Sequence, residues 1–190
     1  MKKTLLFLTA VVLLISLCGC GTVSQEPQGQ TMHVYYSLDE YFQSNPVDGA
    51  EFEPPAVPNK LPEGAEFKKI NRKDTYVHTI YSYPYREDLF GPAEDKDEYE
   101  YQQVTRILYE RWLPGTTEEQ KASNDQIIQS EGGNTVTVNG TEYGYKLIAE
   151  ENRYYFSYID SDAGAIFVGI PAIATPEELV EYLDVYLAVP

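Results

Sequence analysis

The chain has 190 residues, a formal net charge of −16 at pH 7 and 17 tyrosines. This length fits one domain. An acidic surface repels nucleic-acid phosphates and anionic lipid head groups, so nucleic-acid binding is excluded. The excess of carboxylates favours either solubility in a polyanionic cell envelope, or a basic partner or loosely held divalent cations.

The first twenty residues predict an export signal. Lys2 and Lys3 precede an apolar stretch over 5–17, which has the length of a secretory signal and falls short of the roughly 20 residues of a transmembrane helix. The following "LCGC" resembles the lipobox of bacterial lipoproteins. That resemblance implies cleavage after Gly19, a thioether-linked diacylglycerol on Cys20, and anchoring on the extracytoplasmic face of the cell membrane.

Cys18 and Cys20 are the only cysteines. A metal-binding or redox pair would need further ligands, and neither His33 nor His78 has a suitable spacing. Cleavage after Gly19 removes two of the 14 basic residues and none of the 30 acidic ones, which leaves a net charge of −18. The mature chain then has no disulfide, and its core alone must stabilise it.

The domain organisation follows from composition. We expect a signal peptide over 1–19, a flexible tether over 20–31, where the residues are small and polar, and a single α+β domain over 32–190. Within the domain, 46–63 carry five prolines and predict extended connecting chain. Residues 93–130 are expected to be a helical insertion.

Capping signals mark two helices. Ser37 and Glu40 have the spacing of a capping box, so one or two helical turns are expected there. Near the C-terminus, Thr175 is a good N-cap and Glu178 completes a second capping box. This helix is expected to pack a stripe of apolar side chains on the sheet and to close the domain: Leu179, Tyr182, Leu183 and Tyr186.

The central segment also predicts helices. Its acidic start favours a helix N-terminus, and Pro114-Gly115 favours an end, which gives a helix of about 15 residues. One side of that helix would carry Tyr101, Val104, Leu108 and Trp112. A second, weaker helix is expected from Thr116.

Strands are predicted on either side of this segment. "FKKINRK", "TYVHTIYSYPY", "RYYFSYI" and "AIFVGIP" are rich in β-branched and aromatic residues. In "TVTVNGTEYGYKL", Asn139-Gly140 predicts a two-residue hairpin turn that pairs Val138 with Thr141. Together these elements predict an antiparallel sheet of four to six strands with helices packed on one face.

Catalytic and metal-binding motifs are weak. "DSDAG" resembles the start of a calcium loop but lacks later ligands, so a polar hairpin turn is the better interpretation. No nucleophile elbow or phosphate-binding glycine loop occurs. We therefore expect no cofactor, no metal and no enzymatic activity.

Tyrosines join an apolar ring to a polar tip, which suits binding surfaces and half-buried sheets alike. The triads Tyr81, Tyr83, Tyr85 and Tyr154, Tyr155, Tyr158 could form a platform or simply cover the sheet. The first triad leads into an acidic segment, so it predicts a partner surface for a basic envelope protein or peptide: Tyr81, Tyr83, Tyr85, Glu94, Asp95, Asp97 and Glu98.

The order of "PPAVPNKLPEGAEFKKI", "IYSYPY", "TVTVNGTEYGYKL", "YYFSYID" and "TPEELVEYLDVY" resembles an uncharacterised extracytoplasmic domain of Gram-positive lipoproteins and anti-sigma-factor-linked proteins. Its layout is similar to the C-terminal domain of periplasmic regulators that bind an anti-sigma factor. The resemblance covers 54–85 and 134–187, and the chain departs from it in the acidic segment and around Trp112. The family has no established enzymatic activity, so no catalytic residues carry over.

These observations predict a membrane-tethered, non-catalytic binding or sensing lipoprotein. Two alternatives stay open: a carboxylate-based hydrolase of envelope glycans, and a protective lipoprotein that blocks a toxin or phage protein. An enzyme should show converging acids in a concave site, and a binding module a tyrosine-lined face or groove.

Overall fold

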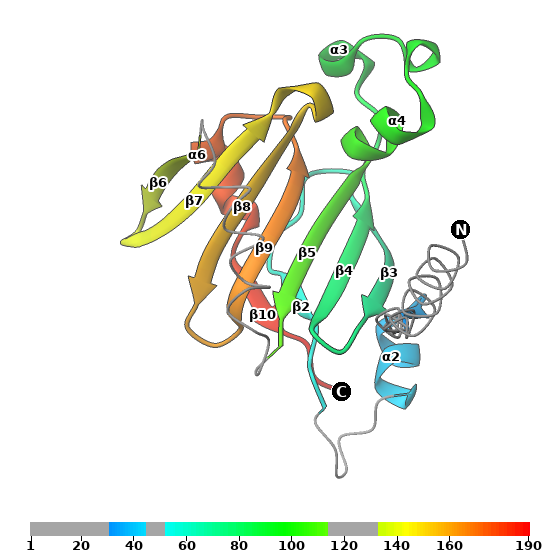
Figure 1. Ribbon diagram of the computed structural model, residues 1–190, viewed down its shortest axis with the longest axis vertical. Helices are drawn as coiled ribbons and strands as arrows, with labels where there is room; N and C mark the ends of the chain where they lie inside the picture. Colours follow the sequence, from blue (N-terminus) through cyan, green and yellow to red (C-terminus); the bar gives the residue numbers. More distant parts are fainter. Residues whose placement is uncertain (1–30, 45–51, 114–132) are drawn as a thin grey trace, which may run out of the picture. The chain divides into compact units, whose positions relative to one another are not determined.

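The computed structural model describes residues 31–44, 52–113 and 133–190 (Figure 1). The chain divides into two compact units, Met1–Thr31 and Met32–Pro190. The predicted signal peptide, Cys20 and nearly all of the predicted tether lie outside the described residues, as does the helix predicted from Thr116. Among the helices that are described, none has the length and apolar character needed to cross a membrane.

The second unit is built on an eight-stranded sheet in which all neighbouring strands are antiparallel. The order across the sheet is β1-β3-β4-β5-β9-β8-β7-β6. The predicted α+β class is confirmed, but the predicted number of strands was too low. The strands are β1 (His33–Tyr35), β3 (Glu66–Arg72), β4 (Tyr76–Ser82), β5 (Arg106–Trp112), β6 (Asn134–Val138), β7 (Thr141–Ile148), β8 (Arg153–Asp160) and β9 (Gly164–Pro171).

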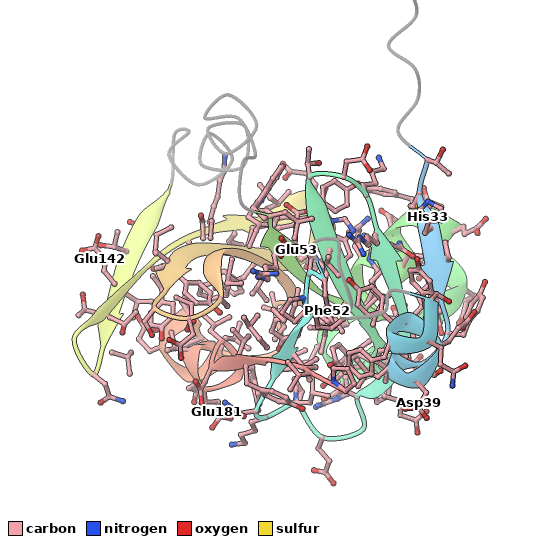
Figure 2. The ribbon with its side chains drawn as sticks, turned by 90° about the horizontal axis from the view of Figure 1, so that it is seen from below. His33, Asp39, Phe52, Glu53, Glu142 and Glu181 are labelled. Atoms are coloured by element: carbon pink, nitrogen blue, oxygen red, sulfur yellow. The ribbon has the colours of Figure 1, made fainter. Side chains whose placement is uncertain are left out.

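The sheet consists of two meanders joined by one non-local pairing. Strands β3, β4 and β5 follow one another in space as in sequence, and so do β6, β7, β8 and β9. The two groups meet where β5 pairs with β9, with Leu108 opposite Gly169. Figure 2 shows Asp39 and Glu142 toward opposite edges of this arrangement, with Phe52 and Glu53 between them.

A thinner layer covers one face of the sheet. It consists of a two-stranded antiparallel ribbon, β2 (Ala56–Pro58) with β10 (Val185–Leu187), and of the turns α6 (Pro176–Leu179) and η3 (Val180–Tyr182), which lie behind the sheet in Figure 1. A contiguous apolar core forms between the layers. Its fully buried members include Ile107, Phe156, Val168, Ile170, Leu179 and Leu183.

Buried tyrosines tie the thin layer to the sheet. The Tyr109 hydroxyl donates to the carbonyl of Tyr182 at 2.7 Å, and the Tyr158 hydroxyl donates to the carbonyl of Leu183. Burial raises the pKa of both phenols above the usual value. Each ring thus fills core volume while its polar tip satisfies a carbonyl that the short helical turns leave unpaired.

The closing helix is shorter than predicted. Its capping box is confirmed, because Thr175 accepts from the Glu178 amide and Glu178 from the Thr175 amide. The chain leaves the helical turns after Tyr182 and pairs as β10 with the proline-rich segment, so a strand rather than a helix ends the domain. Tyr186 is consequently exposed at 48% instead of joining the apolar stripe.

The predicted central helix is wrong in its second half. The segment forms the short turns α3 (Glu87–Phe90), η1 (Ala93–Asp95) and α4 (Glu98–Val104), and then β5, a central strand of the sheet. The prediction followed apolar residues at helical spacing. It missed the strand because β5 carries charged residues on both faces and so lacks the alternation of apolar and polar residues typical of a strand. Those charges are buried and paired: Glu110 contacts His78, and Arg111 contacts Glu53.

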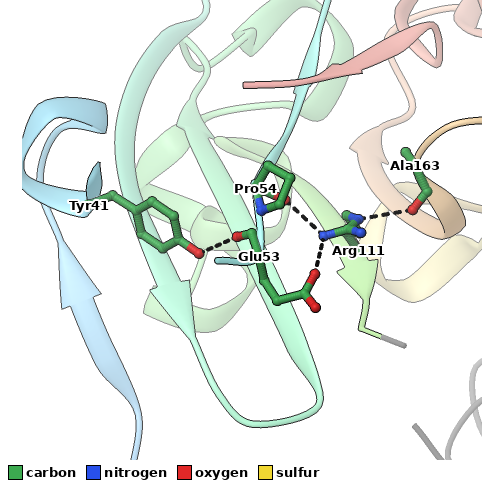
Figure 3. Close-up of polar contacts among 5 residues, drawn as sticks. All are labelled: Tyr41, Glu53, Pro54, Arg111 and Ala163. Atoms are coloured by element: carbon green, nitrogen blue, oxygen red, sulfur yellow. Dashed lines mark hydrogen bonds and ion pairs between the residues drawn. The ribbon is translucent and has the colours of Figure 1, made fainter. Parts of the chain in front are cut away.

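Arg111 lies in a polar contact that joins three parts of the fold (Figure 3). Its guanidinium donates to the Glu53 carboxylate at 2.9 Å, to the Pro54 carbonyl at 3.0 Å and to the Ala163 carbonyl at 2.9 Å. Tyr41, from α2 (Leu38–Ser44), donates to the Glu53 carbonyl at 2.5 Å. This network holds Glu53 and Pro54 of the proline-rich chain against β5.

The predicted hairpin is confirmed in its register. Asn139 and Gly140 adopt φ values of 52° and 85°, as a two-residue primed turn requires, and Val138 lies opposite Thr141. Val136 is buried on the core side, whereas Leu147, near the end of β7, is 43% exposed. The remaining turn, η2 (Ala149–Glu151), connects β7 to β8.

Candidate functional site

Two of the three tyrosines predicted to line a partner surface are buried. Tyr81 and Tyr83 are 4% and 6% exposed and belong to the core between the sheet and the thin layer. Tyr81 makes edge contacts with Phe67 and Tyr109, and burial raises the pKa of its phenol. The prediction that Tyr81 and Tyr83 are exposed is therefore wrong, because both side chains point to the face of the sheet that packs against the thin layer.

The acidic part of the predicted surface is exposed. Residues 86–101, here called the acidic lobe, connect β4 to β5 and extend beyond the ends of these strands (Figure 1). Four predicted residues lie on it with exposed side chains: Glu94, Asp95, Asp97 and Glu98. The lobe also exposes large apolar or aromatic side chains, namely Leu89, Tyr99 and Tyr101.

The aromatic rings at the base of the lobe are ordered by stacking. Tyr85 lies parallel to Tyr101, with ring centroids 5.1 Å apart, and its hydroxyl donates to the Gly91 carbonyl at 2.8 Å. Asp97 caps α4 through a complete capping box with Glu100. The lobe thus presents carboxylates and aromatic rings from a backbone with its own local hydrogen bonds.

A buried arginine ties the end of α4, which follows the lobe, to the sheet. Arg153, which is 1% exposed, donates to the carbonyls of Gln103 at the end of α4, of Arg106 at the start of β5 and of Gly169 on β9. Desolvation, followed by repulsion from Arg106, lowers the pKa of Arg153 to about 10. A positive charge at a helix C-terminus is favourable, and here it also satisfies the Gln103 carbonyl, which the helix leaves unpaired.

A basic pocket lies on the face of the sheet opposite the thin layer. It has a volume of about 270 Å³ and lies where β3, β4 and the start of β5 meet the end of α4. Its lining includes three cations and no carboxylate: Lys68, Lys69, Asn71, Ile80, Tyr81, Gln102, Thr105 and Arg106. Among the described residues, none of the three cations forms an ion pair.

Next to the pocket, polar side chains form a row across the same face. Asn71 on β3 lies opposite His78 on β4, which lies opposite Glu110 on β5. His78 bonds the Glu110 carboxylate and stacks on Tyr76 with centroids 4.1 Å apart. Stacking and the carboxylate fix the orientation of the imidazole.

The described residues also bear on metal binding and on the hydrolase alternative. Within 31–44, 52–113 and 133–190, no three side chains of the His, Cys, Asp and Glu types come close enough to hold a metal ion. In "DSDAG", Asp160 instead accepts from the amides of Asp162 and Ala163, as in a tight polar turn. A second pocket, of about 210 Å³, has Asp162 as its one carboxylate, so neither described pocket is lined by a pair of acids.

The sequence interpretation missed both the pocket and the row. The pocket brings Lys68 and Lys69 to Arg106, and the row brings His78 to Glu110, across segments that were assigned to different elements. One signal was present. Lys68 and Lys69 lie in the first predicted strand and Arg106 lies in the predicted central helix, and these are three of the few basic residues of an acidic chain. That signal has no meaning until β5 is placed beside β4.

Comparisons with protein-family models, with curated proteins and with solved structures gave no match. The resemblance to extracytoplasmic lipoprotein domains therefore stays a prediction.

Proposed function

We propose that the chain is a lipid-anchored, extracytoplasmic binding or sensing module without catalytic activity of its own. The lipobox supports the anchor at Cys20, and the fold supports a module that presents surfaces. The family resemblance, which has no associated activity, agrees with this proposal.

The observation that carries the binding role is the acidic lobe. Carboxylates and exposed aromatic side chains lie together there, on turns that protrude beyond the sheet ends. Aromatic residues are enriched in protein interfaces, and complementary charge speeds encounter. A basic segment of an envelope protein or peptide fits this surface best.

Anchoring is tested by replacing each cysteine. Cys20→Ala should leave the protein uncleaved or release it from the membrane fraction, whereas Cys18→Ala should change neither outcome. Two acyl chains hold a protein stably where one holds it marginally, so the wild type should resist extraction with salt. Normal acylation and cleavage of Cys20→Ala would contradict the anchor.

Partner binding is tested by capture of envelope proteins at low and high salt. Glu94→Gln, Asp95→Asn and Glu98→Gln together neutralise exposed lobe carboxylates and leave the Asp97 cap intact. The matched control, Glu63→Gln with Glu142→Gln and Glu177→Gln, removes the same charge from exposed positions elsewhere. A basic partner should be lost with the lobe variant and at high salt, and kept by the control.

If both triple variants retain every captured protein at both salt levels, the lobe is not the partner surface.

The nature of a captured protein distinguishes a sensing role from a protective role. A host envelope component supports sensing, and a foreign toxin or phage protein supports the protective role. Release of sugars from purified envelope glycans would favour the hydrolase.

A further inference from the structure

The basic pocket is an exception to the charge of the rest of the chain. In a sequence with 30 acidic and 14 basic residues, its lining brings Lys68, Lys69 and Arg106 together without a carboxylate. Ordinary surface cations on such a protein would be expected to pair with one of the many acids. Here the local charge is uncompensated by the described residues and faces a cavity.

A β-bulge creates this concentration of charge. Phe67 lies opposite Tyr81, but Lys69 lies opposite Ile80, so Lys68 is an extra residue in β3. Successive side chains of a regular strand point to opposite faces, and a bulge breaks that alternation. It thereby allows two consecutive lysines to line one pocket while Phe67 still packs against Tyr81 in the core.

Two residues of the pocket lining each carry a buried polar atom with no partner among the described residues. Asn71 is 7% exposed, and its side-chain oxygen accepts no hydrogen bond. Nε of Arg106 is buried and donates none. Unpaired buried polar groups are costly and rare, and they are expected to be satisfied by a ligand or by ordered water. One is an acceptor and the other a donor, so the complementary ligand has both an anionic oxygen and a hydroxyl group.

Size and surroundings favour a small ligand over a polymer. A volume of about 270 Å³ is at the small end of ligand pockets. A small anion in the pocket lies within one screening length, about 8 Å at physiological salt, of three cations. An extended polyanion would also meet the acidic surface that dominates this chain, and that surface repels it.

We propose that the pocket binds a small phosphate-type oxyanion that carries a hydroxyl group, either on phosphorus or on an attached carbon. The Lys68 and Lys69 ammonium groups and the Arg106 guanidinium bind the anionic oxygens, and the Asn71 side-chain oxygen accepts from the hydroxyl. Arginine and lysine are the side chains that proteins use for phosphate, the former through directed hydrogen bonds and the latter as a point charge. The nearby Arg153 cation adds to the positive potential, because its guanidinium interacts with that of Arg106.

Titration calorimetry of the full chain in neutral detergent, at neutral pH and constant ionic strength, tests this site with four probes. Inorganic phosphate and glycerol phosphate each carry a hydroxyl and should bind with one-to-one stoichiometry. Sulfate has no proton to donate to Asn71 and should bind about tenfold more weakly, as should dimethyl phosphate, which carries the diester linkage of lipids and polymers. Dimethyl phosphate binding as tightly as phosphate would assign the pocket to a diester group and overturn the proposal.

Variants locate the binding. Arg106→Gln and Lys68→Gln should each weaken phosphate binding about tenfold or more, whereas Lys60→Gln should not. Lys60 loses the same charge but pairs with Glu181, outside the pocket. Lys68 is exposed, so its variant is expected to fold even if Arg106→Gln does not. Asn71→Leu should reduce the preference for phosphate over sulfate.

No phosphate binding by the folded wild type overturns the proposal, and so does an equal loss of affinity in Lys68→Gln and Lys60→Gln. Equal affinity for phosphate and sulfate overturns the role of Asn71. The pocket and the acidic lobe use different residues, so failure of one test leaves the other intact.

Discussion

The two faces of the eight-stranded sheet both carry buried side chains, but of different kinds. Toward the thin layer, β5, β8 and β9 present Ile107, Phe156 and Val168, each with no exposed surface. On the opposite face the least exposed side chains include Glu110 and Arg153. The comparison teaches that apolar area dominates burial on the first face, where Arg111 with Glu53 is a paired exception, and that specific polar pairing contributes more on the other. The basic pocket lies on the polar face.

The largest expected effect concerns a matched pair of phenylalanines. Phe156→Ala should lower the free energy of unfolding by about 3–5 kcal/mol, since it leaves a cavity in the core. Phe167 lies on the opposite face, between Glu110 and Ser157 in register, and stacks on Tyr155. Phe167→Ala should cost about 2 kcal/mol, near the transfer energy of one side chain. Denaturant melts measure both, and equal losses would show that the two faces are packed alike.

Replacing Arg153 tests how much polar pairing on the opposite face contributes to stability. Arg153→Met keeps the volume but removes the donors to three carbonyls, and we expect a loss of about 3 kcal/mol, since each unpaired group costs about 1–3 kcal/mol. A Cβ on Gly169 would lie 2.7 Å from the Arg153 guanidinium, so Gly169→Ala should also destabilise the wild type.

A double-mutant cycle connects the two changes. In the Arg153→Met background, Gly169→Ala should cost less, because the flexible methionine can move away from the new methyl group. Strict additivity in melts would mean that Arg153 and Gly169 do not constrain each other.

The stability of the fold at alkaline pH depends on buried tyrosines from both faces. Burial raises the phenol pKa of Tyr109 on the core face; burial, and then a hydrogen bond to Glu151, raise that of Tyr155 on the other. A phenol whose pKa is higher in the folded state than in the unfolded state contributes its full stabilisation below the unfolded pKa of about 10. That contribution is lost as the pH rises above this value. The free energy of unfolding should therefore fall above about pH 10.

Tyrosine-to-phenylalanine variants show how much each face contributes to the loss of stability above pH 10. Tyr109→Phe and Tyr155→Phe should each make the alkaline loss of stability shallower, while Tyr36→Phe, at a position 70% exposed, should not. Melts from pH 8 to 12 with a tyrosinate absorbance titration would check this. A loss of stability that is unchanged in both buried variants would contradict the assignment.

The smallest expected effects come from the two capping boxes. Thr175→Ala should cost about 1 kcal/mol globally, because α6 covers the core. Asp97→Ala removes a cap of similar strength from the acidic lobe, which lies outside the core. Its effect should appear as faster amide exchange in α4 with little change in the global melt. A global loss as large as that of Thr175→Ala would show that the lobe unfolds with the sheet.

Local signals made part of this fold predictable. The Asn139-Gly140 turn, the Asp160 turn and the Thr175 cap each depend on residues within a few positions of one another, and the structure contains all three. Strand β5 depends on partners that are distant in sequence. Glu110 and Arg111 fall within the predicted central helix because nothing near them in sequence reveals His78 and Glu53.

The basic pocket was unpredictable for a related reason. The "KK" dipeptide in β3 predicts one inward and one outward lysine if the strand is regular. Only the shifted register between Phe67 and Lys69 places both beside Arg106, and that shift depends on how β3 pairs with β4. The burial of Tyr81 and Tyr83 likewise required knowledge of which face the thin layer covers.

The junction between the two meanders has a kinetic consequence. Each meander forms from neighbouring segments, but Leu108 must meet Gly169 across an intervening chain that includes all of β6, β7 and β8. Contacts between distant segments pay their loop-closure entropy before they contribute stability, and they slow folding. We expect the β5–β9 pairing to form late in folding. A transient form with two ordered meanders would then expose two additional strand edges, which are templates for association with other copies of the chain.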